Sequence, residues 1–295
     1  MHIPDGFLSA PVWSAFDVLA PPALGIAARR AQRGLDERNV PLLGVMGAFV
    51  FAAQMINFPV GPGTSGHLVG AALLAIALGP AAASVVMASI LAVQALVFQD
   101  GGILSLGANI FNMAIAGVLA GYLPYRLLAR AHRSSAIFLA GALSVLASAA
   151  FALAELILSG VPVPRRVLLL SMGFFFAGAL VEGGITLAAV RAMERLNPRW
   201  FRTPEETAFP APGWIAAAAL LLVAAGVLAA STYPDGIERL AAAHAPAWVH
   251  APLAGYSFQG VEPPWLRRVL AAAAGLLLIY GACLWAGRLI SRRSA

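Results

Sequence analysis

The stretch GHLVGAALLAIALGPAAASVVMASILAVQALVF, residues 66–98, contains no charged residue. One membrane crossing needs about 20 apolar residues, so this run is too long for a single ordinary span. Gly79-Pro80 interrupts it, because proline has no backbone N–H and breaks a helix. We therefore expect two membrane segments, over 67–79 and 81–98. The first is too short to cross the hydrocarbon core, and short segments interrupted by Gly or Pro are typical of transport sites in the membrane interior.

Similar apolar runs occupy most of the chain. Hydrophobic residues make up 60% of the 295 residues and charged residues only 11%, with a mean hydropathy of +0.83. A soluble domain carries about 25% charged residues. Runs of this length in hydrocarbon must be helices, because each backbone N–H and C=O needs an internal partner. The sequence thus predicts an all-α polytopic membrane protein with nine spans, at about 9–28, 40–58, 67–79, 81–98, 108–128, 136–159, 167–192, 213–231 and 267–290.

A change of composition near residues 196–212 divides the chain. Asn-Pro, Thr-Pro-Glu-Glu and Pro-Ala-Pro-Gly follow one another there, which is typical of a linker between domains. We predict a seven-helix membrane domain over 1–195, a cytoplasmic linker over 196–212 and a two-helix appendage over 213–295. The appendage has a hydrophilic loop at about 232–264, which we place on the external side.

The basic residues predict the orientation in the membrane. The net charge is +6, and all 19 basic residues are arginines that lie at the ends of apolar runs, which favours a lipid bilayer and not nucleic acid as the partner. With the N-terminus outside and the C-terminus inside, fourteen arginines face the cytoplasm and five face outwards, in agreement with the positive-inside rule. The first ten residues lack the features of a cleaved signal peptide. We expect a multi-pass protein of the bacterial cell (inner) membrane, with Met1, His67 and residues 99–112 on the external side.

The N-terminus has the composition of a metal chelate. The chain begins Met1-His2, so the α-amine, the His2 main-chain nitrogen and the His2 ring Nδ1 can bind one metal through fused five- and six-membered rings. The amine loses its proton readily to a metal, because its ordinary pKa is about 8. A planar set of nitrogen ligands suits Ni(II) or Cu(II). The only cysteine, Cys283, excludes a disulfide framework and a cysteine cluster, so the ligands must be nitrogen or oxygen.

His67 is the candidate for the fourth planar position. It opens the short third span, and the turn signal Ile3-Pro4-Asp5-Gly6 allows the N-terminus to fold back towards it. Each histidine alone is more often an ordinary loop or capping residue. The metal-site interpretation rests on the two together, both on the external side, without a competing cluster of Cys, Asp or Glu.

Other polar residues have two interpretations each. Asn109 and Asn112 share a helix face, and Gln54 and Asn57 repeat their spacing. Each of these four either supports the metal ligands from a second layer or caps a helix. Two acidic residues, Glu155 and Glu182, lie in or near spans, where a charge is costly. We favour a structural pairing for both over a proton relay.

Several of these motifs resemble those of a known family. MHIPDGFL at 1–8, GPGTSGHL at 61–68, VQALVFQDGG at 93–102 and GANIFNM at 107–113 are similar to the substrate-specific (S) component of energy-coupling-factor (ECF) nickel/cobalt ABC transporters, the CbiM/NikM family, over about residues 1–195. The resemblance implies that Met1, His2 and His67 bind the metal. The tail, with YPDGIE at 233–238, resembles the small two-span partner subunit (CbiN/NikN) whose signature is PDGLE.

The resemblance also implies partners and a function. It implies a transmembrane coupling (T) subunit and cytoplasmic ATPase subunits; the chain itself has no phosphate-binding G-x-x-x-x-G-K-[ST] motif. We therefore expect a non-enzymatic transport component without a cofactor, whose transported ion is Ni(II) or Co(II). A cobalt-specific version that supplies cobalamin biosynthesis is the alternative. An ATP-independent metal/proton antiporter using Glu155 and Glu182 and a membrane-bound metal sensor are further alternatives.

Overall fold

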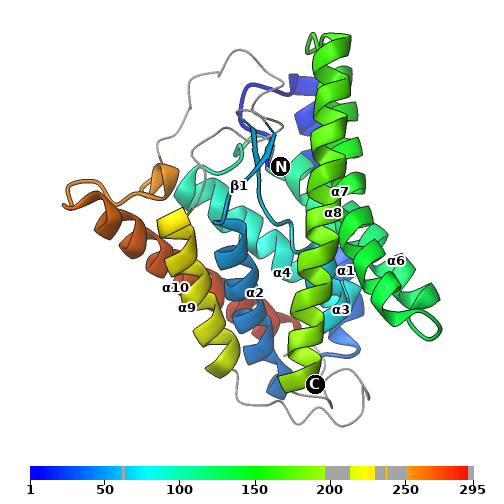
Figure 1. The fold of residues 1–295 in the computed structure, drawn as a ribbon, viewed down its shortest axis with the longest axis vertical. Helices are drawn as coiled ribbons and strands as arrows, with labels where there is room; N and C mark the ends of the chain where they lie inside the picture. The colour runs from blue at the N-terminus through cyan, green and yellow to red at the C-terminus, as the bar shows by residue number, and fades with distance from the viewer. Residues whose placement is uncertain (62–63, 197–212, 230–236, 238–250, 292–295) are drawn as a thin grey trace.

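The computed structural model describes residues 1–61, 64–196, 213–229, 237 and 251–291. These residues form a bundle of helices with one small β-hairpin at one end (Figure 1). Within these described residues, six helices are long and apolar enough to cross a membrane, and two shorter apolar helices accompany them. The prediction of an all-α polytopic membrane protein is therefore confirmed.

The helices follow the expected spans, with bounds that differ by a few residues. The helices within the first hundred residues are α1 (Ala10–Gln32), α2 (Val40–Gln54), α3 (Ala71–Leu78) and α4 (Pro80–Val93). The later ones are α5 (Leu106–Asn109), α6 (Val118–Leu128), α7 (Arg133–Leu158), α8 (Arg165–Leu196), α9 (Gly213–Ala229) and α10 (Pro264–Ser291). Two π-helical stretches, η2 (Gln94–Phe98) and η3 (Ile110–Gly117), continue α4 and join α5 to α6, and short 3-10 turns form η1 (Glu37–Asn39) and η5 (Ala254–Tyr256).

The third expected span is shorter than predicted. Helix α3 begins at Ala71, and residues 67–70, the His67 segment, are not helical. Gly70 has a φ of +73°, and a Cβ there would lie 2.5 Å from Val50 Cγ1, so the chain turns sharply against α2 before the helix starts. The predicted break is present, because Gly79 has a φ of +78° and Pro80 begins α4.

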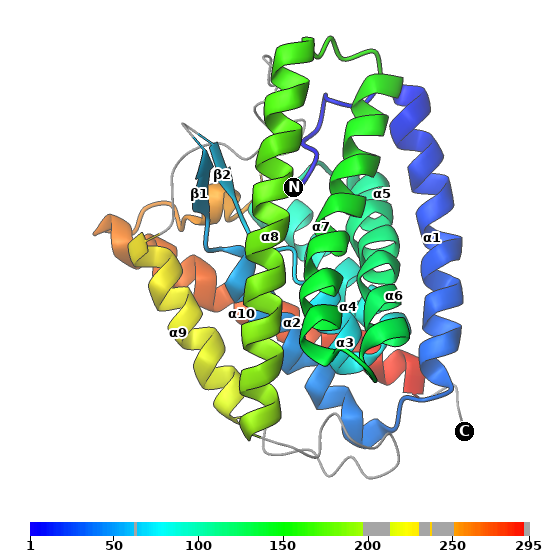
Figure 2. The same ribbon diagram turned by 45° about the vertical axis from the view of Figure 1, so that its right-hand side comes forward.

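The second expected span also ends early. Helix α2 stops at Gln54, and the chain then forms the hairpin of β1 (Phe58–Gly61) and β2 (Thr64–Gly66), which pair antiparallel with Phe58 opposite Gly66. The idea that Gln54 and Asn57 share a helix face is therefore wrong. The hairpin lies beside α8, at the end of the bundle where the N-terminus lies (Figure 2), and His67 follows it directly in the chain.

Glycines bring the helices close together. A Cβ at Gly47 of α2 would lie 2.7 Å from Cys283 Sγ of α10, and one at Gly275 of α10 would lie 2.4 Å from the Phe51 ring of α2. Helix α10, the last span of the predicted appendage, thus packs directly on α2. The division into domains stays a prediction, since the predicted linker lies outside the described residues apart from Leu196.

Candidate metal centre

The N-terminal segment, residues 1–6, is fixed to the start of the fifth span. The Ile3 N–H donates to Asn109 Oδ1 at 2.8 Å, and Asn109 Nδ2 donates to the Ile3 carbonyl at 3.1 Å. The Gly102 N–H donates to the same carbonyl at 2.9 Å, and the Ile3 side chain is fully buried. Both main-chain groups of Ile3 are therefore satisfied, which places Met1 and His2 just beyond an anchored residue.

A turn is present one residue later than predicted, with Asp5 and Gly6 at its centre and Gly6 at a φ of +86°. The Asp5 carboxylate accepts the N–H of Leu104 at 2.8 Å and that of Ile103 at 3.1 Å. A Cβ at Gly102 would lie 2.2 Å from Asp5 Oδ1, so only glycine allows this approach. The turn and the glycine together direct the terminus into the bundle.

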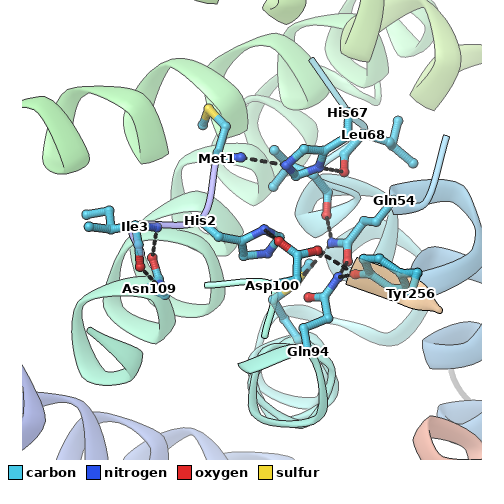
Figure 3. Close-up of polar contacts among 12 residues, drawn as sticks. Met1, His2, Ile3, Gln54, His67, Leu68, Gln94, Asp100, Asn109 and Tyr256 are labelled. Atoms are coloured by element: carbon cyan, nitrogen blue, oxygen red, sulfur yellow. Dashed lines mark hydrogen bonds and ion pairs between the residues drawn. The ribbon is translucent and has the colours of Figure 1, made fainter. Parts of the chain in front are cut away.

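Met1, His2 and His67 meet at this end of the bundle (Figure 3). The Met1 amine nitrogen lies 2.5 Å from His67 Nε2. The rings of His2 and His67 are stacked, with centroids 5.1 Å apart and planes within 5°. The His2 side chain is buried, whereas Met1 and His67 are half-buried. Residues separated by more than sixty positions thus bring an amine and two imidazoles into one place.

The His67 ring is oriented by its own segment. The Nδ1–H donates to the Leu68 carbonyl at 3.0 Å. This contact fixes the tautomer, because the other ring nitrogen, Nε2, then keeps its lone pair. Nε2 is the atom that faces the Met1 amine. His67 therefore presents Nε2 in the direction of the N-terminus.

The His2 ring contacts an acidic residue that the sequence analysis did not single out. His2 Nδ1 lies 2.9 Å from Asp100 Oδ1, and the other carboxylate oxygen accepts the hydroxyl of Tyr256. Burial alone would raise the pKa of Asp100, but the His2 and His67 rings and the Tyr256 hydroxyl stabilise the carboxylate and hold its pKa below the usual range. Burial and the Asp100 charge raise the pKa of Tyr256. Asp100 is therefore an anion beside His2.

Tyr256 comes from the predicted appendage. It stacks on Phe98 with ring centroids 4.7 Å apart, and the Leu253 N–H donates to the Val97 carbonyl at 2.9 Å. Residues beyond 250 thereby reach the surroundings of His2. The sequence offered one signal for Asp100, a charge directly after the uncharged run, but it offered none that links Tyr256 to it.

Two glutamines continue the polar contacts towards the His67 segment. Gln94 Nε2 donates to Gln54 Oε1 at 3.0 Å and lies 3.4 Å from the Tyr256 hydroxyl. Gln54 Nε2 in turn donates to the Val69 carbonyl at 2.8 Å. Gln54 is thus in contact with the segment that carries His67.

The four predicted supporting residues divide into two pairs. Asn109 and Gln54 contact the segments that carry His2 and His67. Asn112 instead donates to Glu155 Oε2 at 2.8 Å. Asn57 is half-buried after α2, and within the described residues it has no hydrogen bond to Met1, His2 or His67.

Few of the candidate metal ligands around Met1, His2 and His67 belong to the usual metal-binding side chains. In the part of the chain that the structure describes, no group of three or more His, Cys, Asp or Glu residues is arranged to hold a metal ion. The nitrogens that the structure brings together are the Met1 amine and His67 Nε2, with the His2 ring stacked on His67 and its Nδ1 turned to Asp100. Such a set favours a late transition metal over the hard cations, which prefer oxygen.

The fold and this nitrogen-rich end define a multi-pass membrane protein whose polar centre lies at the N-terminus. Residues 2–200 match the family model described as "Cobalt uptake substrate-specific transmembrane region", CbiM. The match covers more than half of the chain, and the chain therefore belongs to the CbiM family.

Individual relatives agree with this assignment. The chain is 42% identical over 200 residues to a protein of Archaeoglobus fulgidus named as a fused nickel transport protein, NikMN; the match covers 67% of each chain. It is 39% identical over 147 residues to the cobalt transport protein CbiM of Acetoanaerobium sticklandii, covering 49% of this chain and 61% of that relative. A crystal structure of a transition metal transporter is 33% identical, with a TM-score of 0.58, and the likeness covers 68% of this chain and 95% of that one.

Proposed function

We propose that the chain is the substrate-binding membrane component of an ATP-driven uptake transporter for nickel, or for cobalt. The observation that carries the proposal is the 2.5 Å approach of the Met1 amine to His67 Nε2 beside the stacked His2 ring. Membership of the CbiM family supports the transport of a divalent metal. In this proposal the metal ion is the transported substrate, and the chain holds it without changing it.

The proposed ligands are the Met1 amine, the His2 main-chain nitrogen, His2 Nδ1 and His67 Nε2. His67 Nε2 carries a lone pair in the structure as it stands, because its Nδ1–H is used by Leu68. His2 Nδ1 faces Asp100, so the metal must replace that contact. Binding releases protons from the amine and the amide, and the Asp100 carboxylate lowers the cost of a positive ion nearby.

The choice between the two ions rests on coordination preference and on the relatives. A planar nitrogen set favours Ni(II), and the relative matched over 200 residues at 42% identity is named for nickel. Cobalt remains the second candidate, because the family description names cobalt uptake. A cobalt-specific chain would supply cobalamin biosynthesis.

Energy and partners complete the proposal. ATP hydrolysis takes place on separate cytoplasmic subunits, and a transmembrane coupling subunit joins them to this chain. The chain lies in the bacterial inner membrane with its N-terminus external and its C-terminus cytoplasmic. The antiporter alternative has less support, because both carboxylate oxygens of Glu182 accept backbone hydrogen bonds and Glu155 Oε2 accepts a hydrogen bond from Asn112 Nδ2.

The test is uptake of labelled nickel and cobalt by cells that express the chain with its partner subunits. The variants are His2→Ala, His67→Ala and a chain with one residue inserted before Met1; His132→Ala, at an exposed residue beside α7, is the matched control. We expect loss of uptake in the first three and normal uptake in the control. The mass of the purified intact chain establishes whether Met1 is the mature N-terminus. Undiminished uptake by the extended chain would overturn the amine site.

A further inference from the structure

One buried carboxylate lies beside the proposed metal centre without touching its ligands. Glu182 belongs to α8 and is only 1% exposed. Its Oε2 accepts the Val69 N–H at 2.8 Å and its Oε1 accepts the Gly70 N–H at 2.9 Å. Both oxygens are therefore used by the His67 segment, which is more than one hundred residues away in the sequence.

The His67 segment depends on partners outside itself. The first N–H groups of a helix have no intrahelical acceptor, and Gly70, in a left-handed conformation, lies directly before α3. A carboxylate at this end of a helix is stabilised by two N–H donors and by the helix dipole. Glu182 thus caps α3 from a different helix, at the point where the chain leaves His67.

Val69 is held from two sides. Its N–H donates to Glu182 and its carbonyl accepts Gln54 Nε2 at 2.8 Å, and its side chain is fully buried. The main chain two residues after His67 therefore has little freedom to shift or rotate. Because His67 Nδ1 is bonded to Leu68, the ring follows the position of this main chain.

The position of Glu182 is itself fixed by the contact of α8 with α7. A Cβ at Gly141 of α7 would lie 2.9 Å from the Glu182 carbonyl, and one at Gly183 would lie 2.7 Å from the Phe138 carbonyl. Such close contacts between two long helices define the distance of the carboxylate from the bundle. The placement of α8 is transmitted to the His67 segment through two hydrogen bonds.

We propose that Glu182 is a positioning residue for metal binding, which fixes His67 Nε2 relative to Met1 and His2 through Val69 and Gly70. This inference rests on the proposed function, in which His67 is a ligand. A planar nitrogen set requires its fourth donor at a defined place. A displacement of the His67 segment therefore weakens Ni(II) binding and changes the coordination of the bound ion. A purely structural Glu182 would change stability alone.

The test compares Glu182→Gln with Glu155→Gln in the purified full-length chain. Glu155, in α7, is also 1% exposed, but it contacts Asn112 and not the His67 segment. The amide of Glu182→Gln retains one acceptor oxygen and turns an NH₂ group towards the second N–H. We expect Ni(II) affinity to fall by up to about tenfold, the lower end of the range found for groups that orient metal ligands, because the loss cannot exceed that of removing His67, and we expect the visible absorption of bound Ni(II) to change. Glu155→Gln should leave both unchanged.

Two further measurements separate positioning from stability. Melting temperatures without metal identify any general loss of stability, and Glu182→Asp, which keeps the charge on a shorter side chain, carries the same test if Glu182→Gln does not fold. In a His67→Ala background, Glu182→Gln should cause no further loss of Ni(II) affinity, because its effect passes through His67. An additive loss in the double variant would contradict the inference.

The outcomes distinguish the inference from the proposed function. Unchanged Ni(II) binding by His67→Ala would overturn the proposed site, and the inference with it. Reduced binding by His67→Ala, together with equal affinities for Glu182→Gln and Glu155→Gln, would overturn the positioning role alone.

Discussion

The two histidines are carried by segments that are held in different ways. The N-terminal segment is fixed by residues of one neighbourhood, between Gly102 and Asn109. The His67 segment is held from two distant helices, by Gln54 of α2 and Glu182 of α8. A local change can therefore displace His2, whereas His67 depends on the packing of the whole bundle.

The imidazole rings of His2 and His67 also differ in their hydrogen-bond partners. The His2 ring has an acidic partner on Nδ1, while the His67 ring uses the neighbouring carbonyl and directs Nε2 at the Met1 amine. In the proposed site, His2 Nδ1 exchanges Asp100 for the metal and His67 Nε2 exchanges its contact with the Met1 amine, while the His67 ring keeps its hydrogen bond to the Leu68 carbonyl. The His67 ring is therefore already oriented, and the N-terminal segment completes the site.

The largest expected effect separates the two histidines directly. His2→Ala removes the ring from the proposed chelate, and we expect Ni(II) affinity to fall by roughly a hundredfold, about 2.8 kcal/mol. His67→Ala removes one single donor and should cost about tenfold, or 1.4 kcal/mol. Isothermal titration of the purified variants with Ni(II) checks the order. A larger loss for His67→Ala would reverse our interpretation of which residue completes the site.

The next effect breaks the N-terminal segment without changing a ligand. Gly102→Ala places a Cβ 2.2 Å from Asp5 Oδ1, so the turn must move away. We expect Ni(II) affinity to fall by about tenfold or more, in line with the effect of misplacing a ligand's support. Gly34→Ala is the matched control, because nothing lies within 4 Å of a Cβ there. Equal binding by the two variants would show that the turn does not determine the position of His2.

A smaller effect is expected at the anchor of Ile3. Asn109→Leu leaves the Ile3 N–H without its partner and the Ile3 carbonyl with the Gly102 N–H alone, and an unsatisfied buried polar group costs about 1–3 kcal/mol. Asn112→Leu, three residues later, removes a similar bond to Glu155. We expect both variants to melt at lower temperature, with only Asn109→Leu lowering Ni(II) affinity. Loss of affinity in both would mean that the measurement reports general stability.

The smallest expected effect concerns the contact between the C-terminal region and His2. Tyr256→Phe removes the hydroxyl that donates to Asp100 but keeps the ring that stacks on Phe98. A single hydrogen bond to a charged group is worth about 1.5–3 kcal/mol, part of which water replaces, so we expect a change in Ni(II) affinity of about threefold to tenfold. Tyr280→Phe, on α10 against Gly44, is the control. Identical affinities in the two variants would leave Asp100 independent of Tyr256.

Local patterns in the sequence predicted part of the site. Gly79-Pro80 predicted the break before α4, which is present, and Ile3-Pro4-Asp5-Gly6 predicted a turn near the N-terminus, which lies one residue later than expected, at Asp5-Gly6. Such features depend on the backbone preferences of a few adjacent residues, which follow directly from the residue types. The meeting of Met1, His2 and His67 was also predicted, from the side of the membrane to which the arginines assigned them.

Contacts between distant residues were not readable in this way. Glu182 was interpreted as paired with some other group, but its partners are the main-chain N–H groups of Val69 and Gly70, which leave no trace in residue type. Asn57 was expected to repeat the role of Gln54, but the helix ends between them and the hairpin begins. Spacing along a helix predicts a shared face only where the helix continues.

The sequence by itself determined that this chain is a helical membrane protein. A long uncharged run in lipid satisfies its backbone N–H and C=O groups within the same segment only when it forms a helix. It also determined which nitrogens stand at the N-terminus. The tertiary structure alone decided that Asp100 and Tyr256 flank His2 and that Glu182 holds the His67 segment. These contacts join residues separated by up to 156 positions, and they arise from the packing of helices through small residues, which no local pattern encodes.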